Sequence, residues 1–267
     1  MSIVVEGLHK TFGSHHVLKG IDFAFETGKI NMIIGASGSG KTVLLKCMVG
    51  LLTPEEGRVS FDGIDIHRLP YRQMRELRKQ IGMLFQGGAL FDSQTVAENV
   101  AFPLRMFTQL KEREIRDRVQ LSLERVNLPK AGALYPGEIS GGMKKRVGIA
   151  RALVLGPRYL FCDEPNSGLD PETAEVIDQL IRRLTDELGI TTVVVSHDMK
   201  SVLSIGDHIL FVFQGHRQWV GTREEVSSAE DPYLQKFIEI SGVIDVFASK
   251  PSGYNRSLPT GPIERRR

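Results

Sequence analysis

A glycine-rich loop between an apolar strand and a helix constrains the fold of this chain more than any other feature. Residues 30–34 read Ile-Asn-Met-Ile-Ile, and Gly35-Ala-Ser-Gly-Ser-Gly-Lys-Thr42 follows directly. The residues after the loop predict a helix from Lys41 to about Leu51. The loop has the spacing G-x-x-x-x-G-K-[ST], in which glycines let backbone N–H groups surround phosphate groups. The sequence therefore predicts an α/β fold with a phosphate-binding loop at a strand-to-helix junction.

The residues of this loop suit a nucleotide. The Lys41 ammonium is expected to reach the β- and γ-phosphates, and the Thr42 hydroxyl is a ligand for Mg²⁺. The alternative is a glycine-rich turn with an incidental lysine, which would not require the strand–loop–helix context seen here. The residues expected to contact the nucleotide are Gly35, Ala36, Ser37, Gly38, Ser39, Gly40, Lys41, Thr42 and Val43.

Two acidic residues end the apolar run Tyr159-Leu-Phe-Cys-Asp163-Glu164. Asp163 lies at the end of the expected strand, where a carboxylate can bind Mg²⁺ through water. Glu164 is then placed to orient and deprotonate the water that attacks the γ-phosphate. The alternative is that the two acids only cap the next helix.

A histidine follows a further apolar strand. His197 comes directly after residues 191–196, where its ring can hydrogen-bond the γ-phosphate or hold the attacking water. No other histidine has such a placement. We interpret as surface or turn residues His9, His15, His16, His67, His208 and His216.

The pattern of apolar residues predicts an antiparallel β part followed by a parallel α/β part. Near the N-terminus, alternating apolar and polar residues and the Asp62-Gly63 turn indicate short antiparallel strands. Helical patterns cover residues 71–79 and 111–126. Later apolar runs alternate with helices, which is typical of a parallel sheet covered on both faces. These runs cover residues 159–163, 191–196 and 208–213.

Composition narrows the class of protein. Apolar residues make up 41% and charged residues 25% of the 267, which is typical of a globular protein. The net charge of +2 gives no argument for nucleic-acid binding. No uncharged apolar run approaches the roughly 18 residues needed to cross a bilayer. The N-terminus lacks the pattern of a secretory signal, and Cys47 and Cys162 lack metal-ligand spacing. We therefore expect a cytosolic protein.

The segment Ile139-Ser-Gly-Gly-Met143 opens a basic helical run that continues to Leu153. Its Ser-Gly-Gly start offers free backbone N–H groups at the positive end of a helix dipole, which suits an anion. With this segment included, the order of motifs resembles the ATP-binding cassette (ABC) family. The matching positions are Phe12 (the ring that stacks on adenine), Gly35–Thr42 (Walker A), Gln86 (Q-loop), Ile139–Met143 (signature motif), Asp163–Glu164 (Walker B acids), Ser167–Asp170 (D-loop) and His197 (switch histidine).

The resemblance implies the fold of a P-loop NTPase, the ABC ATPase. This fold has a parallel core sheet, an N-terminal antiparallel β subdomain and an inserted α-helical subdomain, here at about residues 88–155 within a domain of residues 1–241. It also implies ATP and Mg²⁺ as cofactors. The implied catalytic residues are Glu164, His197 and Gln86, and the implied metal-binding residues are Thr42, Gln86 and Asp163.

In this family two cassettes pack head to tail, and each signature motif contacts the γ-phosphate bound by the other subunit. The resemblance therefore implies a homodimer. The residues implied to contact nucleotide beyond the phosphate loop are Phe12, Ser140, Gly141, Gly142 and Asp170. Met143 replaces the usual glutamine and has no side-chain donor, so the phosphate contacts would come from Ser140 and backbone N–H groups.

Met143 and the segment Phe85–Leu104 are similar to the ATPases of the MCE-associated, Mla-type lipid transporters. This similarity implies ATP-driven phospholipid transport and a peripheral position on the cytoplasmic face of the inner membrane. The implied partners are membrane permease subunits, an MCE lipid-binding protein and a small regulatory subunit, with no nucleic acid. Phe91 and Phe102 would then line a groove that receives a cytoplasmic helix of the permease, although both could instead pack the helical subdomain.

Three other functions use the same motifs. ABC ATPases of DNA repair carry a long coiled coil between the phosphate loop and the signature motif, whereas here only about 100 residues without heptads intervene. Translation-associated members join two cassettes in one chain. A transporter ATPase for metal, amino acid or lipoprotein stays open, and only the Mla-like features argue against it.

Residues 242–267 are expected to form a C-terminal tail. They contain too few apolar groups for a core of their own. Phe247, Tyr254 and Leu258 have the spacing of anchors on an extended strand. One interpretation is a disordered end, and the other is a tail that is partly ordered against a partner subunit.

Overall fold

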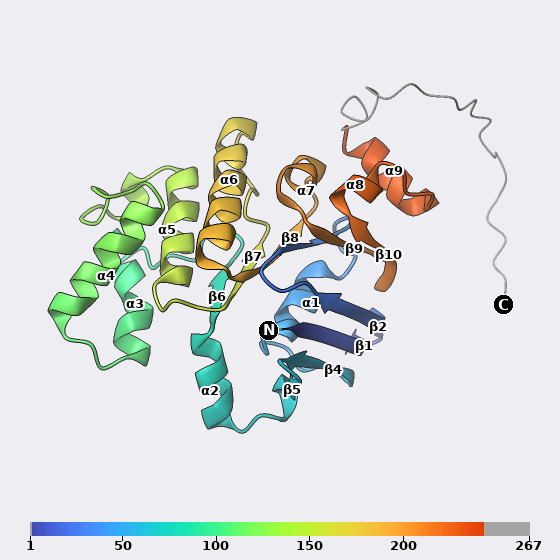
Figure 1. Ribbon diagram of the computed structural model, residues 1–267, viewed down its shortest axis with the longest axis horizontal. Helices are drawn as coiled ribbons and strands as arrows, with labels where there is room; N and C mark the ends of the chain where they lie inside the picture. Colours follow the sequence, from blue (N-terminus) through green and yellow to red (C-terminus); the bar gives the residue numbers. More distant parts are fainter. Residues whose placement is uncertain (1, 243–267) are drawn as a thin grey trace.

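The computed structural model describes residues 2–242, and two β-sheets form its framework (Figure 1). The smaller sheet is antiparallel, with the strand order β2-β1-β4-β5. Its strands are β1 (Ile3–Phe12), β2 (His15–Phe25), β4 (Glu56–Phe61) and β5 (Ile64–Asp65). The hairpin between β4 and β5 turns at Asp62-Gly63, as predicted, with Asp62 at φ 51° and Gly63 at φ 81°.

The larger sheet has the order β10-β9-β3-β8-β7-β6. All neighbouring strands run parallel except β9 and β10, which form an antiparallel pair. The strands are β3 (Ile30–Ile34), β6 (Ile81–Leu84), β7 (Tyr159–Asp163), β8 (Thr191–Ser196), β9 (His208–Phe213) and β10 (His216–Thr222). The parallel core sheet and the antiparallel N-terminal sheet confirm the predicted fold class.

Helices lie on both sides of the larger sheet and beyond its end. Helices α3, α4 and α5 pack against one another at the end opposite α8 and α9, as Figure 1 shows. Helix α5 also packs on β6 and on α6. The bounds are α1 (Lys41–Met48), α2 (Tyr71–Lys79), α3 (Val96–Phe107), α4 (Glu112–Arg125), α5 (Gly141–Leu153), α6 (Pro171–Leu188), α7 (Met199–Ile205), α8 (Arg223–Val226) and α9 (Pro232–Ile240). Short 3₁₀ turns span Ile66–Arg68 and Pro136–Glu138.

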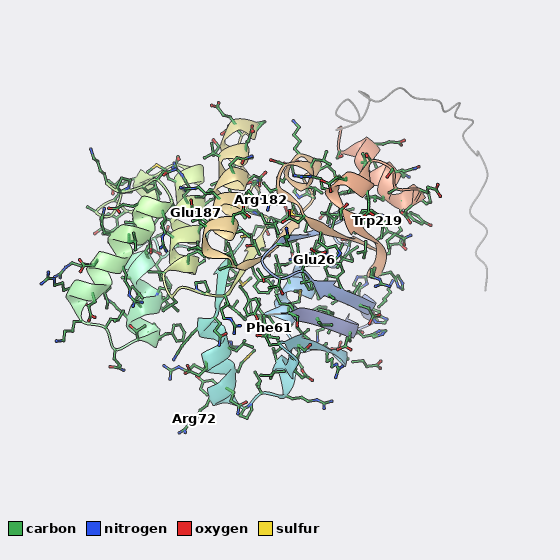
Figure 2. The ribbon with its side chains drawn as sticks, viewed as in Figure 1. Glu26, Phe61, Arg72, Arg182, Glu187 and Trp219 are labelled. Carbon is green, nitrogen blue, oxygen red and sulfur yellow. The ribbon has the colours of Figure 1, made fainter. Side chains whose placement is uncertain are left out.

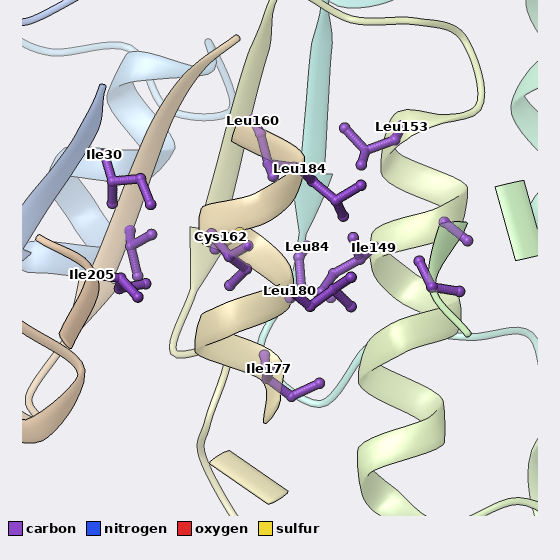
Figure 3. Packing of buried hydrophobic residues seen from close by; sticks show 14 of the residues in the cluster. Ile30, Leu84, Ile149, Leu153, Leu160, Cys162, Ile177, Leu180, Leu184 and Ile205 are labelled. Carbon is purple, nitrogen blue, oxygen red and sulfur yellow. The ribbon is translucent and has the colours of Figure 1, made fainter. Parts of the chain in front are cut away.

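Alternate residues of the parallel strands enter two different cores. On β7, Leu160 and Cys162 pack with α5 and α6, whereas Tyr159 and Phe161 face α1 and the antiparallel sheet. Figure 3 shows the first core, in which Leu180 and Leu184 of α6 lie between the sheet and α5. Side chains of a strand point to alternate faces, so burial of both sets explains why these strands read as continuous apolar runs. The sheet is therefore fixed rigidly from both faces.

The antiparallel sheet closes the second core. Phe61 is buried and its ring meets the Tyr159 ring edge-on, with centroids 4.9 Å apart. Figure 2 shows Phe61 inside the body of the molecule, whereas Arg72 extends from the outer end of α2. The contact ties the N-terminal sheet to β7, the strand that ends at Asp163 and is followed by Glu164.

Several boundaries differ from the sequence-based prediction. The first helix ends at Met48 rather than near Leu51, because Gly50 takes a left-handed φ of 67°. The sequence patterns did not predict α3, β6, β10 or α9. Helix α3 contains Pro103, and β6 has only four residues, so their periodic signals are weak.

Within residues 2–242, no helix combines the length and the apolar character needed to cross a membrane. The expected contact of the C-terminal tail with a partner subunit concerns residues 243–267, which lie outside the described part of the chain. The insertion of a helical subdomain at about residues 88–155 stays a prediction about domain boundaries, although α3, α4 and α5 fall inside that range.

Candidate functional site

A pocket of about 830 Å³ opens at the carboxyl edge of the parallel sheet. The phosphate loop follows β3, Glu164 follows β7 and His197 follows β8, so three neighbouring strands deliver their next residues to one edge. Such an edge is the usual ligand-binding place in parallel α/β sheets. The described residues that line the pocket are His15, Val17, Ala36, Ser37, Gly38, Gly40, Lys41, Thr42, Val43, Gln86, Glu164, His197, Phe237, Ile240 and Ser241.

The phosphate loop is tightly folded. Gly35 has φ 149°, and a Cβ at this position would lie 2.2 Å from the Val212 carbonyl oxygen, so the close approach to β9 requires glycine. The Lys41 ammonium donates to the carbonyl oxygens of Gly35 (2.8 Å) and Ala36 (3.0 Å). Burial lowers the pKa of Lys41, while the charges of Glu164 and Asp163 act in the opposite direction. The lysine is thus folded back over the loop, within its cavity.

Thr42 and Asp163 meet at the base of the site. The Thr42 hydroxyl donates to Asp163 Oδ1 at 3.1 Å, although the two residues are 121 positions apart. Burial raises the pKa of the Asp163 carboxyl, and the bond from Thr42 lowers it. A hydroxyl and one carboxylate are ligands that suit Mg²⁺, which usually keeps several waters and phosphate oxygens in its shell. Within residues 2–242 no cluster of three His, Cys, Asp or Glu side chains could hold a metal ion alone.

Glu164 and His197 form a direct pair on the pocket wall. His197 Nδ1 lies 2.8 Å from Glu164 Oε2, and the glutamate side chain is only 13% exposed, against 62% for the histidine. Glu164 has φ 49°, a left-handed conformation that is uncommon for a residue other than glycine. Strained backbone of this kind often occurs at functional sites. The pair points a nearly buried carboxylate and an exposed imidazole into the same pocket.

The signature residues lie elsewhere. Ser140, Gly141 and Gly142 are not among the described residues that line the pocket. Ser140 caps α5, and its hydroxyl accepts from the Met143 amide at 3.3 Å. Asp170 caps α6 in the same way, because its carboxylate accepts from the Thr173 amide (2.9 Å) and hydroxyl (2.6 Å). The Thr173 hydroxyl, followed by its amide, lowers the pKa of Asp170.

The residue expected to stack on adenine is not one of the described residues that line the pocket. Phe12 is 46% exposed at the end of β1 and is not among the described lining residues, whereas His15, its partner across the β1–β2 turn, is one of them. His15 is exposed, in agreement with its interpretation as a surface or turn residue, and it also lines the pocket. Helix α9 also reaches the pocket through Phe237 and Ile240. The Phe237 ring packs at a tilt against the Phe211 ring of β9, with centroids 5.4 Å apart, and this contact places the helix there.

Sequence reasoning also missed two cations on α5. Arg151 donates to the carbonyl oxygens of Gly88 and Ala89, both at 2.8 Å, and so holds the segment after Gln86. Lys145 is 4% exposed and donates to the Glu164 carbonyl oxygen at 3.2 Å. The only sequence signal for these residues is the basic character of the helix, which does not show which cations turn inward.

A family model described as ABC transporter matches residues 18–167, more than half of the chain. The chain belongs to the ABC transporter family. Its phosphate loop, Asp163 and Glu164 all fall inside the matched range.

Individual relatives within the ABC transporter family are similar over most of the chain. The "Intermembrane phospholipid transport system ATP-binding protein MlaF" of Haemophilus influenzae is 43% identical over 237 residues, 89% of this chain and 90% of the relative. The "Probable ribonucleotide transport ATP-binding protein mkl" of Mycobacterium tuberculosis is 41% identical over 238 residues, 89% of this chain. This chain spans 66%, just under two thirds, of the length of that mycobacterial relative.

A solved ABC cassette has the same fold. It is a dimeric ATP-binding cassette in a post-hydrolysis state, bound to ADP and phosphate, with a TM-score of 0.76 and 31% sequence identity. The match covers 83% of this chain and 98% of that one. The predicted ABC ATPase fold is thereby confirmed.

Proposed function

We propose that this chain binds and hydrolyses ATP as the motor subunit of a membrane transporter for phospholipid. The observation that carries the ATPase proposal is the pair Glu164–His197, 2.8 Å apart, on the wall of the pocket that contains the phosphate loop. A general base must stand within hydrogen-bond reach of its water and be oriented by a further group. Glu164 has both a place beside the loop and an orienting partner.

Each residue of the pocket then has a chemical task. The phosphate loop and Lys41 bind the phosphates, Glu164 accepts a proton from the attacking water, and His197 holds the glutamate and reaches toward the γ-phosphate. Gln86 lines the same pocket, where its side chain would contact the attacking water or the metal. Mg²⁺, held by Thr42, Asp163 and Gln86, would neutralise charge on the β- and γ-phosphates. Phe12 would stack on the adenine beside His15.

We further propose that the active unit is a homodimer. Ser140 lies at the N-terminus of α5, outside the pocket of its own chain, where free N–H groups and the helix dipole favour a phosphate. The solved cassette at 31% identity is itself dimeric, which supports this arrangement. In the dimer, Ser140, Gly141 and Gly142 would contact ATP on the partner, and Asp170 would lie beside that nucleotide.

The lipid assignment is supported by the relative whose printed name concerns intermembrane phospholipid transport, which is 43% identical over nearly its whole length. The proposed partners are permease subunits, an MCE lipid-binding protein and a small regulatory subunit. The chain would bind them as a peripheral protein at the cytoplasmic face of the inner membrane. The relative named for ribonucleotide transport favours a second candidate, a transporter of ribonucleotides.

A shallow apolar groove is the proposed contact for the permease. A cavity of about 300 Å³ is lined by apolar residues of β6 and by aromatic residues of α3 and of the loop between them, with Arg78 and Arg151 also on its wall. Phe91 and Phe102 are 41% and 36% exposed, with ring centroids 5.0 Å apart. Partly exposed aromatic rings in a concave surface are typical anchors for a partner helix. Their exposure favours docking over the alternative that both rings only fill the core.

Two measurements test the proposed function. Glu164→Gln preserves the shape of the side chain but removes the base, so ATP should still bind while turnover falls by roughly 10²-fold or more. Glu187→Gln, an exposed residue of α6 that Figure 2 labels at the helix surface, is the matched control and should hydrolyse ATP as the wild type does. Wild-type turnover in Glu164→Gln would remove the glutamate from its role.

The transported class is tested by purification of the complex from native membranes. We expect membrane subunits and phospholipid to be identified by mass spectrometry with the wild-type chain. Bound ribonucleotide other than ATP and its products, with no enrichment of phospholipid, would instead favour the second candidate.

A further inference from the structure

Two lysines are buried among residues 2–242, and the proposed mechanism uses only one of them. Lys41 belongs to the phosphate loop. Lys145 is 4% exposed on α5, behind the strand that ends in the two acids. The helix thus places an ammonium where solvation is poor, and this burial lowers the pKa of Lys145. An apolar side chain would fill the same space without that cost, so the buried cation needs an explanation.

The hydrogen bond that Lys145 donates explains why a cation is buried at this position. Its ammonium donates to the Glu164 carbonyl oxygen at 3.2 Å, and the Ser167 amide donates to the same oxygen at 3.2 Å. On the other side of the residue, the Glu164 amide donates to the Val195 carbonyl oxygen of β8 at 2.9 Å. Glu164 is therefore held by its backbone from both sides in a left-handed conformation, at φ 49°. Of these three contacts, Lys145 alone comes from a helix outside the sheet and its own turn.

The same helix carries the signature motif. Ser140 caps α5, and Lys145 follows five residues later, about 7.5 Å along the helix axis. The helix start is also packed closely, because a Cβ on Gly142 would lie 2.5 Å from Thr173 Cγ2 of α6. A rigid helix of this kind joins the residue that would contact the partner's ATP to the glutamate of this chain's own pocket.

We propose that Lys145 is a positioning residue: its ammonium fixes the backbone of Glu164, so that the carboxylate faces the attacking water, and ties this glutamate to the signature helix α5. This role rests on the proposed ATPase function. It requires a hydrogen-bond donor at the end of the side chain. If Lys145 only filled space in the core, any side chain of similar volume could replace it.

Two substitutions separate the donor from the volume. Lys145→Met retains an unbranched apolar stem and removes the donor, whereas Lys145→Gln retains an N–H donor one bond shorter. Lys144→Met, at the neighbouring, partly exposed position, is the control. In the purified full-length protein with Mg²⁺ and ATP, we expect kcat of Lys145→Met to fall at least 10-fold, with KM within two-fold of the wild type. Lys145→Gln should restore kcat to within about three-fold, and the control should not change it.

Hydrogen exchange provides a readout that does not depend on turnover. Amides of the turn at residues 163–167 should exchange at least 10-fold faster in Lys145→Met than in the wild type, and Lys145→Gln should restore protection. Wild-type kcat and exchange in Lys145→Met would overturn the proposal. Equal losses in both variants would also overturn it, because only volume or charge would then matter. If the wild type does not hydrolyse ATP, or Glu164→Gln retains turnover, the ATPase proposal fails, and the exchange data still decide whether Lys145 holds the turn.

Discussion

A buried carboxylate on α6 makes the stability of the fold depend on pH. Asp178 is 4% exposed and accepts from Asn166 Nδ2 at 2.8 Å, beneath the turn that connects Glu164 to α6. Burial raises its pKa from 3.8 to about 6, against the lowering effect of hydrogen bonds from Ser201 and Asn166. The charges of Asp198 and Glu175 raise the pKa further. The folded protein therefore binds the Asp178 proton more tightly than the unfolded chain does.

The sign and size of the effect follow from this difference. Below about pH 3.8 both states are protonated and Asp178 contributes nothing to pH dependence. Between about pH 4 and 6 only the unfolded chain releases the proton, so the free energy of unfolding falls as pH rises. Above pH 6 the folded protein carries the full free-energy cost of the ionised Asp178. The difference between the pKa values of 3.8 and about 6 corresponds to about 3 kcal/mol as an upper limit.

Asp178→Asn removes the titration and retains an oxygen that can accept from Asn166. We expect the variant to be more stable than the wild type at pH 7.5, by up to about 3 kcal/mol, and the gap to close as pH falls from 6 to 4. Urea unfolding followed by circular dichroism at several pH values measures this gap. Asp117→Asn, an exposed position on α4, is the control and should show no such gap. Equal stability at pH 7.5, or a gap that does not change with pH, would refute the reasoning.

Three further predictions concern the proposed assembly. Mixing Ser140→Phe with Lys41→Ala should restore part of the ATPase activity that each variant lacks, because one of the two composite sites then contains neither lesion; no recovery would argue against sites shared between subunits. Ile240→Ser should weaken ATP binding about 5-fold in calorimetry, the effect of about 1 kcal/mol of lost apolar contact. Binding of inorganic triphosphate should not change, and Ile64→Ser, at another exposed position outside the pocket lining, should change the binding of neither ligand. The Phe91→Asp variant should no longer co-purify with the permease, although its melting temperature should equal that of the wild type. If the variant still co-purifies with the permease, the docking groove lies elsewhere.

Local patterns in the sequence were sufficient for the strand–loop–helix unit and for the parallel sheet. The glycine and lysine spacing of the Gly35–Thr42 loop is specific to phosphate-binding loops. The three continuous apolar strands require cover on both faces of the sheet. The apolar runs also predicted strands that end beside Asp163, Glu164 and His197. Because carboxyl ends of parallel strands share an edge, the sequence was sufficient to expect these three residues at one edge of the sheet.

Short or interrupted elements could not be predicted in this way. Helix α3 contains Pro103 inside its span, and β6 is four residues long, so neither produces a full period of apolar positions. The position of α9 against β9 depends on the contact between the Phe237 and Phe211 rings. Such contacts join residues that no local pattern relates.

The sequence by itself determined which residues could carry the chemistry, because phosphate loops and acids at strand ends are local arrangements. Only the tertiary structure decided what surrounds them. His15 and Ile240 come from opposite ends of the chain to the same pocket wall, and Lys145 turns inward beneath Glu164 while Lys144 does not. The physical reason is that the direction of a helix face, and the distance between segments far apart in sequence, are set by packing of the two cores and not by the residues' own preferences.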